Sequence, residues 1–334
     1  MKASVKASRS SQGRLLARKI GLVLAAATAA LVFASPTSAV TVPLPNVYTG
    51  GAVNVGSSTA LLLGAVNAKG QATTYLFQYG ASRALGLQTP PAPAGPSTAT
   101  VRVGKAVGGL QSNTLYYYRL IASDARGTVL GAEHSFRTRK VPLSIQIAAT
   151  PSPVPFGDSF TLAGTLSGTG GGGRVVALQA NPFPYTTGFK TLGNPEVTSA
   201  TGAFSFPVVG LLSNTQLRVV MTAAPYLASP VLLQGVAVQV SLHVRQAHRH
   251  RRGNFVRFYG TITPAEPGAH IGIQLLRPGG RSINQGGTIV TSASAGFSHF
   301  STVVRVRHRG LYQVLVQVFD GSHVSAYSEP VRIG

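Results

Sequence analysis

The chain has 334 residues, of which 44% are hydrophobic and only 11% are charged. This hydrophobic content is high enough to form hydrophobic cores, so the chain is not a disordered tail. The length predicts two or three domains. The absence of cysteine excludes disulfides and thiolate metal sites, and the formal net charge is +22.

The first 39 residues have the three parts of a secretory signal peptide. Six Lys and Arg residues precede an uncharged run at 20–34, and a small-residue stretch, Ser35 to Ala39, follows it. We predict that residues 1–39 are a signal peptide cleaved after Ala39, which makes the mature chain secreted or associated with the cell envelope. An uncleaved membrane anchor is the alternative, although the run is short for a spanning helix, which needs about 20 residues.

Residues 40–139 contain two β-strand motifs with distinctive spacing. The first is YLFQYG at 75–80, and the second is Leu-x-x-x-Thr-x-Tyr-x-Tyr-Arg-Leu from Leu110 to Leu120. These motifs resemble strand C and the E–F corner of bacterial fibronectin type III domains. The resemblance implies that Leu110 closes the end of the core and that the hydroxyl of Tyr116 ties down the preceding loop. The chain departs from that family in having no tryptophan.

Residues 140–334 contain two copies of one module, because four segments recur in the same order at offsets of 93 to 96 residues. The pairs are FGDSFTLAGTL (156–166) with RGNFVRFYGTI (252–262), VVALQ (175–179) with HIGIQ (270–274), Phe204-Ser205 with Phe297-Ser298, and NTQLRVVM (214–221) with RGLYQVLV (309–316). We therefore predict repeats at 140–239 and 240–334, which resemble bacterial immunoglobulin-like surface repeats. The predicted fold class is all-β: three tandem immunoglobulin-like/fibronectin type III-like β-sandwiches after an N-terminal signal peptide.

The sequence predicts no catalytic residue, no cofactor and no enzyme. The seven acidic residues are scattered, and nothing in their spacing suggests the paired carboxylates of a glycosidase. His134 is the only histidine before position 243, so a Ser–His–Asp site has little basis in the first two modules. The glycine run that ends at Gly173 precedes no predicted helix and is therefore a loop, not a nucleotide-binding motif.

Seven of the eight histidines lie in the last module, and His248-x-His250 has a spacing that is common among metal ligands. Arginines alternate with these two histidines, however, and their charge would repel a cation. No carboxylate is close in sequence to offset that charge. We therefore predict a basic, solvated turn and no metal site, with a transition-metal site as the alternative.

The last module also has the largest excess of positive charge, with eleven arginines and three acidic residues in 240–334. In the predicted strand VVRVRHRG (303–310), arginines alternate with valines and face one side, about 6.5–7 Å apart. At that spacing they repel one another unless an anion lies across them. The candidate polyanion-binding residues are Arg249, Arg251, Arg252, Arg305, Arg307 and Arg309. A solvated basic face is the alternative interpretation.

The favoured function is a non-enzymatic secreted or cell-envelope protein that acts as a structural spacer or interaction module. Binding of an acidic envelope polymer or other polyanion is the alternative. Carbohydrate binding is a weaker alternative. Tyr117 would be the aromatic platform for a sugar, but packing against a neighbouring module explains an outward-facing Tyr117 equally well. The expected partner is an unknown protein or an acidic polysaccharide of the envelope. Nucleic acid is disfavoured, because an exported chain rarely meets it and no aromatic residues interleave the arginines. Membrane contact is expected only through an uncleaved signal.

Overall fold

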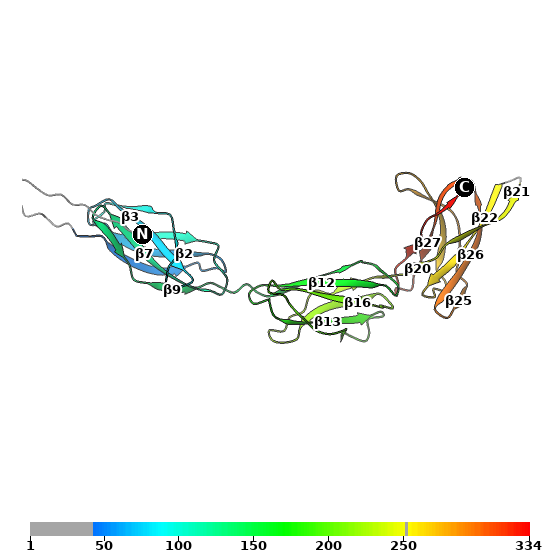
Figure 1. The fold of residues 1–334 in the computed structure, drawn as a ribbon, viewed down its shortest axis with the longest axis horizontal. Helices are drawn as coiled ribbons and strands as arrows, with labels where there is room; N and C mark the ends of the chain where they lie inside the picture. The colour runs from blue at the N-terminus through cyan, green and yellow to red at the C-terminus, as the bar shows by residue number, and fades with distance from the viewer. Residues whose placement is uncertain (1–42, 251–252) are drawn as a thin grey trace, which may run out of the picture. The chain divides into compact units, whose positions relative to one another are not determined.

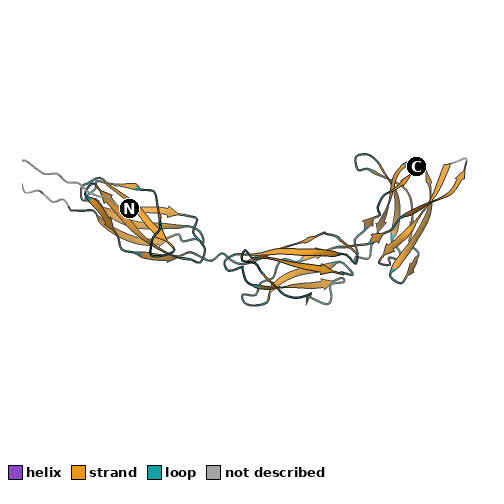
Figure 2. Ribbon diagram, in the orientation of Figure 1, coloured by secondary structure: helices purple, strands orange, loops and turns teal. Residues whose placement is uncertain are grey.

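The computed structural model describes residues 43–250 and 253–334, so the predicted signal peptide lies outside the described residues. The described residues form 29 β-strands and contain no helix (Figures 1 and 2). No helical membrane span is therefore found in this part of the chain. The strands form three β-sandwiches, each with two sheets and its own hydrophobic core. The all-β, tandem-sandwich prediction is confirmed. The predicted domain boundaries stay a prediction, because defining them requires a test of whether each segment folds by itself.

The first sandwich contains strands β1 to β9. One sheet has the order β1 (Asn46–Val53), β2 (Ala60–Asn67) and β6 (Val101–Val107). The facing sheet contains β3 (Thr73–Gly80), β4 (Leu87–Gln88), β5 (Ala92–Gly95), β7 (Leu115–Asp124), β8 (Gly127–Leu130) and β9 (His134–Arg137). Alternate residues of these strands point inward, and Leu62, Phe77 and Leu120 have no exposed area in the core between the sheets.

The corner before β7 has the geometry that the sequence predicts. Leu110 is buried at the end of the core, and the backbone N–H of Gln111 donates a hydrogen bond to the Tyr116 hydroxyl at 3.0 Å. The predicted roles of Leu110 and Tyr116 are confirmed. The third sandwich repeats the device, since the Tyr312 hydroxyl donates to the carbonyl of His308 at 2.7 Å.

The second sandwich contains strands β10 to β19. One sheet has the order β10 (Ser144–Thr150), β12 (Ser159–Ser167) and β16 (Ala203–Val209). The facing sheet contains β13 (Val175–Pro182), β14 (Lys190–Thr191), β15 (Glu196–Val197), β17 (Thr215–Met221) and β18 (Leu232–Gln234). A short parallel pair, β11 (Val154–Pro155) and β19 (Val236–Ala237), completes it. Its core contains Leu162, Leu217 and Val219, which are fully buried.

The third sandwich contains strands β20 to β29. One sheet contains β20 (Gln239–Val240), β21 (His243–His250), β22 (Gly253–Thr263), β25 (Ser292–Ser294) and β26 (Phe297–Val306). The facing sheet contains β23 (His270–Leu276), β24 (Ser282–Ile289), β27 (Gly310–Gln317), β28 (Ala326–Tyr327) and β29 (Val331–Ile333). Phe258, Ile273 and Val314 lie fully buried between the two sheets.

The structure supports three of the four predicted segment matches and corrects the other. Strands β12, β13 and β17 correspond to β22, β23 and β27 at the predicted offsets. The match of Phe204 with Phe297 is wrong, because Phe204 lies opposite Gly164 and the residue opposite Gly260 is Phe300. Phe297 instead pairs with Ser294 of β25, which forms a hairpin with β26, whereas β15, the strand before β16, pairs with β13.

Residues 235–238, the junction segment, share hydrogen bonds with the second and third sandwiches. On one side, Val154 N–H donates to Gly235 O at 2.9 Å and Phe156 N–H donates to Ala237 O at 2.8 Å. On the other, Val324 N–H donates to Val236 O at 2.7 Å, and Val238 N–H donates to Val324 O at 3.1 Å. Both pairings are parallel. The junction segment is therefore one extended chain used by two sandwiches.

Candidate functional site

A groove of about 1240 Å³ lies over the outer face of the sheet that contains β21, β22 and β26. We call it the basic groove and define it by His243, Arg245, Arg257, Tyr259, His299 and Ser301. Strand alternation places these side chains outward, because Val256 and Phe258 are buried and the residues that follow each of them face away from the core.

Two arginines face each other across adjacent strands in the basic groove. Arg245 of β21 lies directly opposite Arg257 of β22, and both side chains are exposed. Like charges in opposite positions destabilise a sheet, since their Cβ atoms lie only about 5 Å apart. No carboxylate lines the groove, and in residues 43–250 and 253–334 neither arginine has an ion pair. An anion bound across the pair would relieve this repulsion.

Uncharged groups beside the arginine pair add hydrogen-bonding and ring surfaces. The guanidinium of Arg257 donates to the Ser301 hydroxyl at 3.4 Å, a long hydrogen bond that leaves most of its donors available. The rings of His243 and Tyr259 lie with centroids 5.6 Å apart and an interplanar angle of 36°, and Tyr259 is 39% exposed. The groove therefore combines cationic donors with an aromatic face.

The structure distributes the six predicted arginines differently from the sequence-based expectation. Arg305 is exposed and lies opposite Phe255, on the same outer face as the basic groove. Strand β26 ends at Val306, so Arg307 and Arg309 lie in the turn before β27 and do not continue the row. Arg249 lies in β21 opposite Asn254, and Arg251 and Arg252 lie outside the described residues.

Sequence reasoning missed Arg245 and Arg257, the two arginines that the groove uses. The signal was present in the alternation of VRFYG (256–260), which places Arg257 on the face opposite Val256 and Phe258. The pairing of Arg257 with Arg245 could not be predicted, because the register between β21 and β22 includes a bulge between Gln246 and His248. Counted from the His250–Gly253 pair, this bulge shifts the partner of every residue beyond it, including Arg245, by one position.

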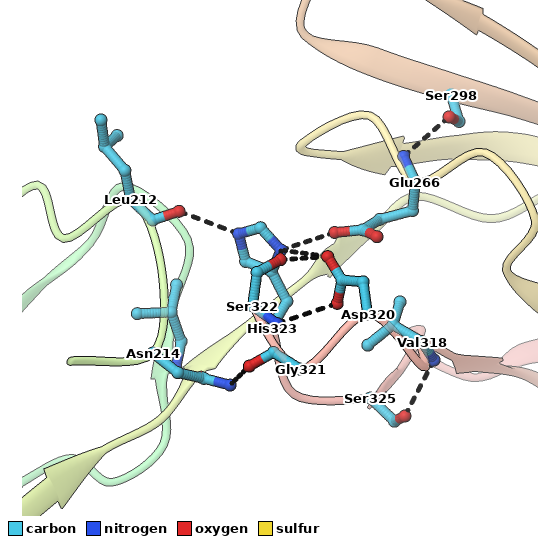
Figure 3. Close-up of polar contacts among 11 residues, drawn as sticks. Leu212, Asn214, Glu266, Ser298, Val318, Asp320, Gly321, Ser322, His323 and Ser325 are labelled. Atoms are coloured by element: carbon cyan, nitrogen blue, oxygen red, sulfur yellow. Dashed lines mark hydrogen bonds and ion pairs between the residues drawn. The ribbon is translucent and has the colours of Figure 1, made fainter. Parts of the chain in front are cut away.

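A second group of polar side chains meets where two loops of the third sandwich approach each other (Figure 3). Glu266 comes from the loop between β22 and β23, and Asp320 and His323 come from the loop between β27 and β28. Their potential ligand atoms all lie within 4.8 Å of one another. The expectation that the acidic residues are scattered is therefore wrong for Glu266 and Asp320, which the fold brings together from positions 54 residues apart.

The His323 ring is held between the two sandwiches by both of its nitrogen atoms. Nε2 lies 2.9 Å from the carbonyl oxygen of Leu212, which can only accept, so Nε2 carries the proton and donates. Nδ1 faces the Ser322 hydroxyl at 2.7 Å, Glu266 Oε1 at 2.6 Å and Asp320 Oδ2 at 3.9 Å (Figure 3). The ring therefore presents Nδ1 to both carboxylates.

The pKa values of the two carboxyl groups in this cluster are shifted in opposite directions. Burial, and then the charge of Asp320, raise the pKa of Glu266, and His323 offsets part of that rise. Burial also raises the pKa of Asp320, but hydrogen bonds from the hydroxyl and amide of Ser322 outweigh it and lower that pKa overall. Asp320 therefore ionises at lower pH than Glu266.

Two further sequence-based hypotheses have different outcomes. Tyr117 is half-buried, and the guanidinium of Arg83 lies 4.7 Å from its ring centroid and pairs with Glu133. One face of the predicted sugar platform is therefore covered. The metal alternative at His248 and His250 stays a prediction: both residues lie in β21, beside the undescribed positions 251–252.

Comparisons with known proteins give remote similarities. No protein-family model matches the chain, and no curated protein matches it significantly. A solved tetra-tandem repeat from the extending region of a large adhesion protein is 13% identical over 87% of this chain and 74% of its own, with a TM-score of 0.31. The FN1–FN3 domains of chicken CNTN1 are 13% identical over 87% of this chain and 99% of their own, with a TM-score of 0.26. At these values neither similarity bears on function.

Proposed function

We propose that this chain is a non-enzymatic protein of the cell exterior whose first two sandwiches are spacers and whose third sandwich binds an acidic polysaccharide. The basic groove is the proposed binding site. The observation that carries the proposal is the opposed pair Arg245 and Arg257, exposed and without a carboxylate partner among the described residues. The cell-exterior part rests on the signal-peptide pattern of residues 1–39.

The chemistry of the groove suits a chain of acidic sugars. Guanidinium groups bind carboxylates and sulfates through two parallel hydrogen bonds, which fixes orientation as well as charge. The Tyr259 ring offers an apolar face for a sugar ring, and Ser301 offers a hydroxyl. Arg305 extends the positive charge along the same face. A polymer with repeated charges would contact the arginine pair and Arg305 together.

We further infer that the first sandwich is a bacterial fibronectin type III-type domain and that the other two are immunoglobulin-like repeats. The strand order of the first sandwich, β1-β2-β6 against β4-β3-β7-β8, and its Tyr116 corner support the first assignment. The repeated register of Gly164 with Phe204 and Gly260 with Phe300 supports the second.

The proposed function predicts salt-sensitive binding of an acidic polymer. Titration of the purified chain with polygalacturonate at 50 and 200 mM NaCl should show affinity falling about tenfold, as the release of counterions from about two charge contacts requires. Neutral dextran of the same length should not bind. Binding that is insensitive to salt, or equal binding of dextran, would contradict the proposal.

A pair of matched variants separates the groove from the overall charge. Arg245→Ser with Arg257→Ser removes two charge-assisted contacts and should weaken polygalacturonate binding at least about tenfold, a loss of at least roughly 1.4 kcal/mol. Arg277→Ser with Arg281→Ser removes the same charge from exposed positions outside the groove and should leave binding nearly unchanged. Equal losses in the two double variants would mean that only net charge matters. Tighter binding of single-stranded DNA than of polygalacturonate would assign the groove to nucleic acid instead.

A further inference from the structure

The cluster of Glu266, Asp320 and His323 has the donor set of a metal site. One imidazole nitrogen and two carboxylates converge from two loops, and their ligand atoms lie within 4.8 Å of one another. We propose that these three side chains bind a divalent transition-metal ion, with zinc as the best match. This site is separate from the basic groove and does not depend on the function proposed for it.

A buried carboxylate oxygen points into this cluster, toward His323. Glu266 is only 6% exposed, and its Oε1 atom has no hydrogen-bond partner. That atom lies 2.6 Å from Nδ1 of His323, which forms an ion pair with it only when this nitrogen carries a proton. The Ser322 hydroxyl, 2.7 Å from Nδ1, donates its one hydrogen to Asp320 Oδ2 and therefore leaves Nδ1 of the neutral ring without a donor. On the neutral ring the lone pairs of Nδ1 and Oε1 face each other, and either a proton on Nδ1 or a bound metal ion removes the cost of this buried contact.

The surroundings of the cluster orient its ligands as metal sites require. A histidine that binds a metal through one nitrogen usually donates its other N–H to a carbonyl or carboxylate, which fixes the ring. The Nε2–Leu212 hydrogen bond does this and leaves Nδ1 for the ion. Asp320 accepts a hydrogen bond from the Ser322 N–H at 3.0 Å, and Glu266 N–H donates to the Ser298 hydroxyl at 2.9 Å. Both acidic residues are thus held in place.

The spacing and the ligand types favour zinc over calcium. Zinc bonds of about 2.1 Å in tetrahedral geometry place neighbouring ligand atoms about 3.4 Å apart. The distances from Nδ1 to Glu266 Oε1 and Asp320 Oδ2 are 2.6 and 3.9 Å, which bracket that spacing and need only side-chain adjustment. Calcium prefers six to eight oxygen ligands, whereas an imidazole favours zinc and its transition-metal neighbours. Asp320, with its side chain 46% exposed, gives the ion a path from solvent.

The experiment uses the chain after chelator treatment and dialysis, with zinc chloride as the probe. Isothermal titration should show one tight zinc ion per chain. Diffraction data collected at the zinc absorption edge should place an anomalous peak between Glu266, Asp320 and His323. This second measurement needs no variant and is therefore unaffected by any loss of folding. An anomalous peak elsewhere, or no binding, would overturn the proposal.

Matched variants test which side chains hold the ion. Glu266→Gln and Asp320→Asn keep the shape of each side chain and should each weaken zinc binding at least about tenfold. The control Glu329→Gln removes an exposed carboxylate of the same sandwich and should leave the dissociation constant unchanged. The variant His248→Gln with His250→Gln tests the other candidate ligands, and zinc binding should survive it. Loss of binding in this variant with retention in Glu266→Gln would assign zinc to the His248 hairpin and refute the proposed site.

Discussion

Phe204 and Phe300 perform the same packing task in the second and third sandwiches. Each ring lies over a glycine on the neighbouring strand, with ring atoms at 2.4 Å and 2.9 Å from where a Cβ of Gly164 or Gly260 would be. Phe300 is 4% exposed and belongs to the core, whereas Phe297 is only half-buried and packs beside His299. A ring that fills the space left by a missing side chain cannot be shortened without creating a cavity.

This packing predicts unequal costs for two alanine substitutions. Phe300→Ala should lower the free energy of unfolding by about 3–5 kcal/mol, because it leaves a cavity next to Gly260. Phe297→Ala should cost less than about half as much, because solvent and the remaining chain fill part of the space. Urea unfolding of the two variants, followed by circular dichroism, measures the difference. Equal costs would show that Phe297 is a core residue after all.

At the residue scale, the sequence predicted the role of a side chain where local spacing defined it. Leu110 and Tyr116 lie six residues apart in one corner, so their contacts follow from a short stretch of chain. The match of Phe204 with Phe297 was wrong because it rested on a dipeptide, which cannot reveal the β25 hairpin before Phe297. Glu266 and His323 lie 57 residues apart, and only the folded loops bring them into contact.

At the level of elements, the sheet of the third sandwich is built around Gly260. A Cβ at this position would lie 2.0 Å from the carbonyl oxygen of Ser241, in the segment between β20 and β21. The close approach of two backbones lets this segment and β21 lie along β22, and both Ser241 and Gly260 line the basic groove. The contacting atom belongs to the backbone of Ser241 and cannot rotate away as a side chain could. Position 260 therefore requires glycine.

Gly260→Ala should therefore displace the segment around Ser241. We expect a loss of about 1–3 kcal/mol or more in unfolding free energy, as for other overpacked sites, together with weaker polygalacturonate binding. Gly272→Ala is the matched control, because its Cβ would meet nothing closer than 4.0 Å. Thermal unfolding and the polymer titration measure both effects. A stable Gly260→Ala variant with unchanged binding would show that the strand tolerates a methyl group.

Strand alternation was the most reliable signal for elements, and strand ends were the least. Val304 and Val306 are buried as the alternation predicts, and Arg305 faces outward. The end of β26 at Val306 was not predictable from residue types, because the turn to β27 depends on where the facing sheet begins. The groove was therefore predictable as a basic face, but its arginine pair was not.

At the scale of the whole molecule, Asn214 links the second and third sandwiches through hydrogen bonds. Its Oδ1 accepts from Val236 N–H at 2.8 Å, and its Nδ2 donates to Gly321 O at 2.9 Å (Figure 3). Its backbone N–H donates to Ser322 O at 2.7 Å. One side chain thus holds the junction segment and the loop that carries Asp320 and His323.

Asn214→Ala should loosen the junction without unfolding either core. Losing two hydrogen bonds and leaving the Val236 N–H unpaired should cost roughly 1–3 kcal/mol locally. Hydrogen exchange followed by mass spectrometry should show faster exchange in peptides that cover 234–238 and 320–325, with β12 unchanged. Asn67→Ala, which removes a side-chain hydrogen bond to Thr98 in the first sandwich, is the control. Faster exchange throughout β12 would instead indicate global destabilisation.

The parallel pairings of the junction segment determine how the chain bears mechanical load. Tension applied through the chain pulls β11 and β19 in opposite directions along their length, so their hydrogen bonds are sheared together and do not unzip one at a time. The bridge between Ala237 and Val324 is also parallel, so tension shears it in the same way. Forced unfolding is governed by the unfolding rate, and bonds that must break together raise its barrier. We therefore expect the junction segment to resist forced unfolding of the second and third sandwiches.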